Sequence, residues 1–284
     1  MLSAATPGDK PDNVLDPRSW RRWALAAAGR IALDAIDTGR KIGAFTLIAI
    51  GAGFTKRRVA QNIIHPLIRQ QIVRSGVRLL PTIAFMGLAL GFVIVSQTVA
   101  LLSKVGATNL TGMLMVAVVV RELGPLAAAL TVLARVGTAT VIELSTIRAT
   151  GEIEALEALG IDPMHYLVVP RVIGLVVSAV TLTVYLIMIA LVSGYLFGFI
   201  QDFPLTPGEY LHQIASALRW EDFVLLVMKT GAYGAVLALT ICYNGLAEPL
   251  RLEEISKATT RMVAQALIGC VLLDAAFILI YLQL

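Results

Sequence analysis

Charged residues inside apolar segments are the first feature of this sequence that could carry chemistry. Arg121, Glu122, Arg135, Lys229 and Asp274 all stand in stretches hydrophobic enough to lie within a lipid bilayer. A charge at the centre of a membrane helix costs about 3 kcal/mol on insertion scales, so such residues are rare and are usually paired or hydrated. They could hold a helix bundle together as ion pairs, line a hydrated cavity that receives a polar head group, or relay protons or ions.

The sequence alone does not decide which of these charges pair. Glu122 with Lys229 and Arg121 with Asp274 would be one permitted arrangement, whereas Arg135 is expected to have a structural role. The Leu-Gly-Pro tripeptide that follows the Arg-Glu pair would allow a local break in the helix. Such a break would widen a cavity beside the charges.

The composition indicates a polytopic membrane protein. Of the 284 residues, 57% are hydrophobic and 15% are charged, and the mean hydropathy is +0.81. These values are wrong for a soluble domain, and we therefore expect an all-α integral membrane protein. Cys242 and Cys270 lie in apolar runs, which favours buried small side chains over a disulfide or a metal site. No metal-ligand cluster, Ser/His/Asp arrangement or phosphate-binding GxxxxGK[ST] motif is present, so we do not expect an enzyme or a cofactor on this chain.

The N-terminal part of the chain predicts a tail and a surface region. Residues 1–17 are polar and rich in proline, and we expect a flexible tail. Residues 18–77 are mixed, with Trp20 and Trp23 on one helical face, and should form interfacial helices; a helix packed on protein is the alternative. Basic residues are concentrated here, ahead of the first long apolar run, which predicts a cytoplasmic N-terminus. Nucleic-acid binding is the weaker interpretation of this charge because no aromatic platform accompanies it.

Residues 78–284 are expected to form a five-span membrane domain. The spans are predicted at about 79–103, 111–138, 166–201, 223–246 and 262–282, so that the C-terminus lies outside. Gly87 and Gly91 have the small-xxx-small spacing that lets another helix approach closely. Thr206-Pro207-Gly208-Glu209 predicts the capped start of a short helix on the outer surface. Arg261, in the basic stretch before the last span, is expected to be a structural charge on the inner side.

A short acidic segment between the second and third spans predicts a structured elbow with a helix at about 150–160. Ile153, Leu156 and Leu159 share one side of this helix. Gly160 can end it in a left-handed turn, and Asp162 can cap the helix that follows. An ordinary loop is the alternative, but a structured loop with an apolar stripe favours a docking element for a cytoplasmic motor.

The segment RELGPLAAALTVLARVGTATVIELSTIRATGEIEALEALGIDPMHYLVVPR, residues 121–171, closely resembles the signature of the MlaE/YrbE family. The resemblance continues in Lys229, in ICYNG and ISKATTR, and in Asp274, and it covers the chain from about Ile31 to the C-terminus. This family comprises the permeases of ABC lipid transporters that work with MCE proteins. EPLRLEE, residues 248–254, departs from a glycine-rich stretch that many members carry there.

The resemblance implies a phospholipid transporter of the bacterial inner membrane that serves outer-membrane lipid homeostasis. The permease would be a homodimer, driven by a dimer of separate cytoplasmic ABC ATPase subunits that hold ATP and magnesium. An MCE-domain protein would receive or deliver the lipid, and it is expected to form a hexameric ring. A small STAS-domain protein often joins the ATPase.

The resemblance also implies roles for individual residues. The polar residues at or near the lipid cavity would be Arg121, Glu122, Lys229 and Asp274. The ATPase would dock on the elbow, through a set comprising Glu143, Arg148, Glu152, Glu154, Leu156, Glu157, Leu159 and Asp162.

Two other functions fit the residues. An ion-coupled secondary transporter or channel would use the buried charges as a relay but would have no use for a motor-docking elbow. A structural scaffold of an envelope complex would tolerate neutral substitutions at Glu122 and Lys229.

Overall fold

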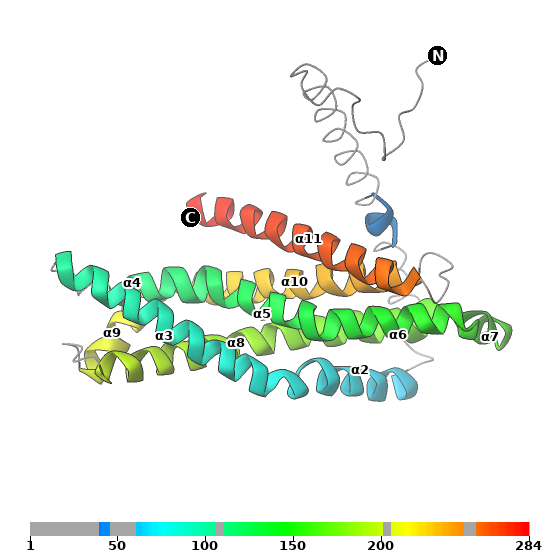
Figure 1. The fold of residues 1–284 in the computed structure, drawn as a ribbon, viewed down its shortest axis with the longest axis horizontal. Coiled ribbons are helices and arrows are strands. Elements are labelled where there is room, and N and C mark those ends of the chain that lie inside the picture. The colour runs from blue at the N-terminus through cyan, green and yellow to red at the C-terminus, as the bar shows by residue number, and fades with distance from the viewer. Residues whose placement is uncertain (1–39, 46–60, 106–110, 201–205, 247–253, 284) are drawn as a thin grey trace, which may run out of the picture. The chain divides into compact units, whose positions relative to one another are not determined.

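The computed structural model describes residues 40–45, 61–105, 111–200, 206–246 and 254–283, and all regular secondary structure within them is helical (Figure 1). The chain divides into two units, Met1–Ile48 and Ala49–Leu284. In the first unit only a short helix over residues 40–45 is described. The predicted tail, most of the predicted interfacial helices and most of the EPLRLEE segment lie outside the described residues.

Among the described residues of the second unit, five helical runs are long and apolar enough to cross a membrane, which confirms the predicted fold class. They are His65–Thr98, Thr111–Ala149, Met164–Phe199, Trp220–Leu246 and Ile255–Tyr281. The first run starts before the predicted boundary at residue 79. It does so because α2 (Gln61–Ser75) leads through the 3₁₀ turn η1 (Val77–Leu79) directly into α3 (Leu80–Val105).

The second run is continuous but changes its helical type twice. α4 (Thr111–Met115) leads into the π-helical segment η3 (Val116–Leu123), and α5 (Gly124–Val132) leads into a second one, η4 (Leu133–Gly137). α6 (Thr138–Ala149) completes the run. The predicted break at the Gly-Pro dipeptide is therefore absent. η3 has the wider turn of a π-helix, and the chain stays helical from η3 into α5.

The third, fourth and fifth runs complete the bundle. After the π-helical turn η5 (Met164–Val168), α8 (Val169–Ile200) packs against α2, α3 and α5, and against α10 (Trp220–Leu246). α11 (Ile255–Gln283) packs on α10 and α6. α8 is thus the helix that most of the others share.

Glycines permit the close approach of α3 to α8. A Cβ atom added at Gly91 would lie 2.1 Å from the Ser193 Oγ, and one added at Gly194 would lie 2.2 Å from a Val95 methyl carbon. Real Cβ atoms do not come so near to other heavy atoms. The small-residue spacing seen in the sequence therefore serves helix packing within this chain.

The elbow contains α7 (Glu152–Ala158), within the range predicted for it. Left-handed glycines bound it on both sides, Gly151 with φ 78° and Gly160 with φ 74°. The Asp162 side chain accepts a hydrogen bond from the backbone N–H of Met164 at 3.0 Å, which caps the next helix. Gly160 and Asp162 thus act as their residue types suggest.

The helix α9 (Pro207–Ala217) begins with the predicted capping box. The Thr206 hydroxyl accepts from the Glu209 N–H, and the Glu209 carboxylate accepts from the Thr206 N–H at 2.9 Å. The predicted position of α9 on the outer surface stays a prediction; within the bundle α9 packs on α4 and contacts α8 through Tyr210, whose hydroxyl donates to the Leu191 carbonyl oxygen at 3.2 Å. The Tyr210 ring stacks 5.3 Å from that of Tyr195, and a Cβ added at Gly112 in α4 would lie 2.5 Å from the Cβ of Gln213.

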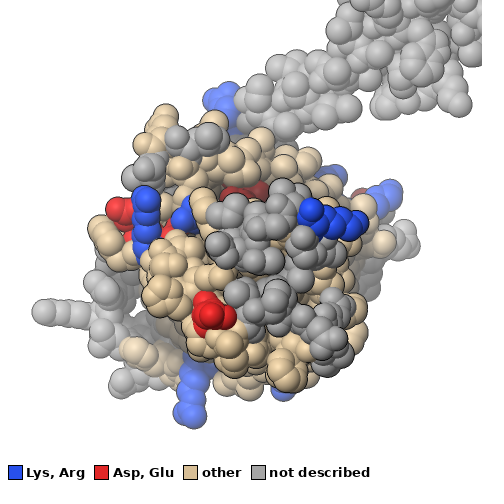
Figure 2. Space-filling view, turned by 90° about the vertical axis from the view of Figure 1, so that its left-hand side faces the viewer, with Lys and Arg blue, Asp and Glu red and all other residues tan. Residues whose placement is uncertain are grey.

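Figure 2 looks at the end of the bundle that carries α4 and α9. Uncharged side chains dominate its described surface, and the acidic and basic side chains there are scattered and do not form a patch of one sign.

Candidate functional site

Lys229 is the centre of the charge cluster within the bundle. It lies in α10, and its side chain has no exposed surface. Its Nζ lies 2.9 Å from Glu122 Oε2 and 2.7 Å from Asp274 Oδ1, and it donates to the backbone carbonyl oxygen of Arg121 at 2.9 Å. An ammonium group has three donors, so all three are satisfied by acceptors from two other spans. A buried charge is tolerated only in such surroundings.

The proline after η3 explains why a backbone carbonyl is available to Lys229. In an α-helix the carbonyl of Arg121 would accept from the N–H of the residue four positions on, which is Pro125 and has no N–H. The π-helical turn instead pairs the Gly124 N–H with the carbonyl of Val119. The carbonyl oxygen of Arg121 can then accept a hydrogen bond from the Lys229 ammonium group. The Gly-Pro dipeptide thus serves the site by exposing an acceptor.

Asp274 brings α11 into the cluster. Besides contacting Lys229, its Oδ1 accepts a hydrogen bond from the Tyr233 hydroxyl at 2.5 Å. Tyr233 follows Lys229 by four residues, so both side chains project from the same face of α10. Tyr233 was not among the predicted site residues, although its spacing of four residues from Lys229 indicates that the two side chains share a face.

Arg121 has a different partner from the one suggested by the sequence. Its Nη2 donates to Asp222 Oδ2 at 3.1 Å, and its Nε lies 2.9 Å from Asp222 Oδ1, within ion-pair distance. The guanidinium also lies 5.5 Å from the ring centroid of Tyr281. The pairing of Arg121 with Asp274 is therefore wrong, whereas Glu122 with Lys229 is observed.

Asp222 was not predicted as a site residue, because the fourth span was predicted to begin at residue 223 and Asp222 was therefore placed in the loop before it. α10 in fact begins at Trp220, so Asp222 occupies its first turn and is 4% exposed. The start of α10 lies beside η3, where Asp222 pairs with Arg121. An acidic residue in the first turn of a helix was the available signal.

The cluster is open on one side. The side chains of Arg121 and Glu122 are each 32% exposed, and that of Asp274 is 18% exposed, while Lys229 and Asp222 are enclosed. With every group ionised, the three carboxylates outnumber the two cations by one. The neighbouring donor and acceptor groups of Arg121 and Glu122 thus remain partly accessible while they are paired with Asp222 and Lys229. This arrangement can bind a polar group that carries both charges.

The two charges expected to be structural lie away from this cluster. Arg135, in η4, is exposed, and among the described residues none forms a hydrogen bond or ion pair with its guanidinium. Arg261, near the start of α11, is exposed and has a partner within the chain. A structural role within this chain is therefore not apparent for Arg135.

The residues predicted for coupling separate into two groups. Glu143 forms ion pairs with Arg74 at 2.5 Å and with Arg171 at 2.8 Å, and so ties α2, α6 and α8 together. Arg148 pairs with Glu154 at 3.1 Å, which fastens α7 to the end of α6.

The α7 helix itself presents a graded apolar stripe. Ile153 is buried at 4% exposure, Leu156 is half-buried and Leu159 is 75% exposed. The three leucine and isoleucine side chains therefore do not form one exposed face: the first anchors α7 to the bundle and the last is available to a partner. Glu152, Glu157 and Asp162 are exposed or half-buried around them.

Comparison with known proteins adds a family assignment. A family model described as Permease MlaE matches residues 68–280. A probable ABC transporter permease protein of Rickettsia felis is 30% identical over 248 residues, which cover 85% of this chain and 92% of that protein. The intermembrane phospholipid transport system permease protein MlaE of Haemophilus influenzae is 29% identical over 256 residues, covering 90% and 95%. The chloroplastic protein TRIGALACTOSYLDIACYLGLYCEROL 1 of Arabidopsis thaliana is 26% identical over 230 residues, covering 80% and 65%.

Proposed function

Because the chain belongs to the MlaE permease family, we propose that it is the membrane-spanning subunit of an ABC-type phospholipid transporter of the bacterial inner membrane. It moves phospholipid between that membrane and an MCE-domain partner, and a separate ATPase that holds ATP and magnesium supplies the energy. The observation that carries the proposal is the internally paired charge cluster around Lys229 within five apolar spans.

The open side of the cluster is suited to a phospholipid head group. Arg121 can donate hydrogen bonds to a phosphate, and Glu122 can accept from an ammonium group; both side chains are about one third exposed. Lys229 and Asp274 are positioning residues: Lys229 holds Glu122 and the Arg121 backbone in place, and Asp274 pairs with Lys229. Since the cluster carries one surplus negative charge, a zwitterionic head group with an exposed ammonium is favoured over one that is only anionic.

The α7 helix supports the proposal of a separate motor. Buried Ile153 packs it against the bundle and Arg148 of α6 forms a partly exposed ion pair with its Glu154, while 75% of the surface of Leu159 is exposed. We assign to it the docking of a cytoplasmic ABC ATPase, which places the N-terminus in the cytoplasm and the C-terminus in the periplasm. A STAS-domain protein would join on the ATPase.

Arg135 supports the proposal of a homodimer. An exposed guanidinium on a spanning helix is costly against lipid, by about 3 kcal/mol on insertion scales, and the described residues offer it no partner. A second copy of the chain, or water held between two copies, would remove that cost. The MCE-domain protein would sit over the dimer at the end that carries α9.

Purification of the affinity-tagged chain from its native membrane tests the proposal. We expect an ABC ATPase and an MCE-domain protein to co-purify, and we expect extraction of the complex to release phospholipid. Glu122→Gln should retain less phospholipid, whereas Lys104→Met, a change to an exposed lysine at the end of α3, should retain as much as the wild type. A purified complex that contains no ATPase would refute the proposal that a separate ATPase drives transport.

A proton or ion relay is the rival function, favoured by the enclosure of Lys229 between two carboxylates. It predicts solute movement driven by an ion gradient in vesicles that contain the chain alone and no nucleotide. Our proposal predicts no movement under those conditions.

A further inference from the structure

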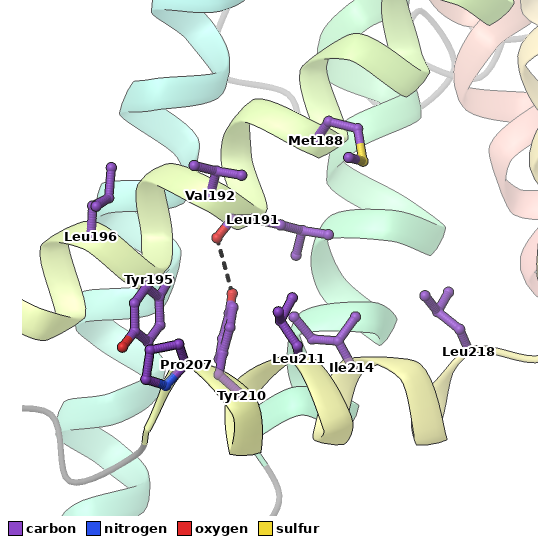
Figure 3. Close-up of a pocket in the computed structure, with 10 residues that line it drawn as sticks. All are labelled: Met188, Leu191, Val192, Tyr195, Leu196, Pro207, Tyr210, Leu211, Ile214 and Leu218. Carbon is purple, nitrogen blue, oxygen red and sulfur yellow. Dashed lines mark hydrogen bonds between the residues drawn. The ribbon is translucent and has the colours of Figure 1, made fainter.

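A polar pocket lies among α2, α6 and the start of α8. Its volume is about 220 Å³, and its polar lining includes Gln71 and Arg74 of α2, Glu143 of α6 and Arg171 of α8. It differs in kind from the groove between α8 and α9, which is lined by apolar side chains and two tyrosines (Figure 3). Of these two cavities, the one beside α2 offers charged groups to a ligand.

This pocket is separate from the charge cluster around Lys229. Glu143 belongs to the same helical run as Glu122, and at about 1.5 Å of rise per residue the two are about 30 Å apart along it. The described residues that line the pocket include no member of that cluster. A ligand bound here would therefore be distinct from a head group held at Arg121 and Glu122.

The side chains that line the pocket carry a surplus positive charge. Glu143 lies 2.5 Å from Arg74 Nη1 and 2.8 Å from Arg171 Nη2, so one carboxylate serves two guanidinium groups. The side chain of Arg171 is only 11% exposed, and its Nη1 donates to the Leu167 carbonyl oxygen at 2.9 Å. An enclosed cation that shares its counterion favours an anion as a further neighbour.

Two buried N–H groups of these side chains have no acceptor among the described residues. They are the amide nitrogen Nε2 of Gln71 and the Nε of Arg171. Gln71 is 8% exposed, and its stem is held against α8, since a Cβ added at Gly174 would lie 2.5 Å from Gln71 Cγ. Buried donors are normally paired, so both point to an acceptor that comes from outside the chain.

The ligand must therefore supply negative charge and several acceptor atoms. Gln71 and Arg74 share one face of α2, because they are three residues apart, whereas Arg171 comes from α8. A phosphate group has acceptor oxygens in several directions, and guanidinium groups bind it through charge-assisted hydrogen bonds. The pocket has the volume of about seven water molecules at about 30 Å³ each, so a group of this size fits.

We propose that the pocket among α2, α6 and α8 binds a phosphate-bearing anion, supplied either by a phospholipid head group or as free phosphate. Leu67, Ile147 and Pro170 complete the lining with apolar side chains, which suits a phosphate joined to a hydrocarbon. The inference goes beyond the proposed function, because this site is separate from the one assigned to the transported lipid.

Photocrosslinking shows whether a lipid phosphate is bound. A diazirine analogue of leucine replaces Leu67, and the purified complex is reconstituted in vesicles that contain either phosphatidylglycerol or the same mole fraction of diacylglycerol, which lacks the phosphate. Adducts are identified by mass spectrometry. We expect adducts with phosphatidylglycerol to exceed those with diacylglycerol several-fold.

Three substitutions assign that preference to the pocket. Gln71→Met removes the unpaired amide at similar volume and breaks no ion pair, so we expect the phosphatidylglycerol adducts to fall several-fold while the unfolding midpoint does not fall. Arg74→Met should lower the adducts about tenfold, as the loss of a hydrogen bond to a charged group does. Arg69→Met, at an exposed position of α2 outside the lining, is the matched control and should leave the adducts unchanged.

Inorganic phosphate, added to lipid-depleted complex at constant ionic strength, tests the other source. If free phosphate is the ligand, it raises the unfolding midpoint of the wild type but not that of Gln71→Met. Equal adducts from the two lipids, together with no such rise, would refute the site. Phosphate effects that are the same in the wild type and Gln71→Met, or an adduct with a protein segment in place of lipid, would also refute it.

ATP-dependent phospholipid transfer, measured on the same preparations, separates this inference from the proposed function. Transfer without any phosphate response that depends on Gln71 would refute the anion site and leave the transporter intact. Such a response without transfer under any condition would support the site and refute the transporter.

Discussion

Lys229→Met is the substitution that tests the charge cluster most sharply. Methionine is close to lysine in volume but leaves Glu122, Asp274 and the free Arg121 carbonyl without the ammonium group that all three contact within 2.9 Å. Removing one partner of a fully buried ion pair costs about 3–5 kcal/mol, and this range is an upper bound here because Glu122 is 32% exposed and Asp274 is 18% exposed. We expect the free energy of unfolding of the solubilised protein to fall by up to this amount, measured by titration with SDS.

A second substitution shows that the loss comes from the pairing. Glu122→Gln removes one of the acids that Lys229→Met leaves unpaired, so the double variant should lose less than the sum of the single losses, by about 1–3 kcal/mol. Lys104→Met controls for the change of residue type and should alter stability by no more than about 0.5 kcal/mol. Additive losses at Glu122 and Lys229, or a neutral Lys229→Met, would refute the cluster as described.

The other predictions concern the elbow, the helix packing and the α9 cap. Leu159→Glu, at an exposed position on α7, should weaken ATPase binding in a pull-down and leave the unfolding midpoint unchanged; unaltered binding would contradict docking there. Gly91→Val should destabilise the α3–α8 contact by about 1–3 kcal/mol or more, because its Cβ would meet Ser193, and an unchanged unfolding transition would refute the contact. Hydrogen bonds to the backbone and side chain of Thr206 hold the pKa of Glu209 below its usual 4.5. The cap is therefore fully present above pH 4.5 and is lost as the pH falls through the lowered pKa. Hydrogen exchange of the α9 amides should accelerate over that pH range in the wild type but not in Glu209→Gln.

The parts of the fold that the sequence predicts are those governed by local physics. Apolar length defines the five spans, and the capping box at Thr206 and the left-handed turn at Gly160 each follow from residues close in sequence. The close approach at Gly91 also follows, because only small residues let two membrane helices meet in this way. In each case a few neighbouring residues carry the whole signal.

The parts that the sequence does not predict depend on depth and on distant partners. α10 begins at Trp220 and not after Asp222, so Asp222, which apolar length alone had placed in a loop, becomes part of the helix and pairs with Arg121 of η3. Pro125 predicted a break in the helix, because it has no N–H to donate to the Arg121 carbonyl. The helix instead continues through a π-helical turn, and the Arg121 carbonyl accepts a hydrogen bond from Lys229. The partners of the five charged residues depend on which helices lie next to one another, and the hydropathy of the sequence carries no information on this.

Transfer of phospholipid from proteoliposomes to acceptor vesicles, measured with the purified complex, tests the central claim most directly. We predict transfer that requires ATP, that disappears in Glu122→Gln and that survives in Lys104→Met. Transfer that proceeds equally without nucleotide, or that follows an imposed ion gradient, would contradict the account.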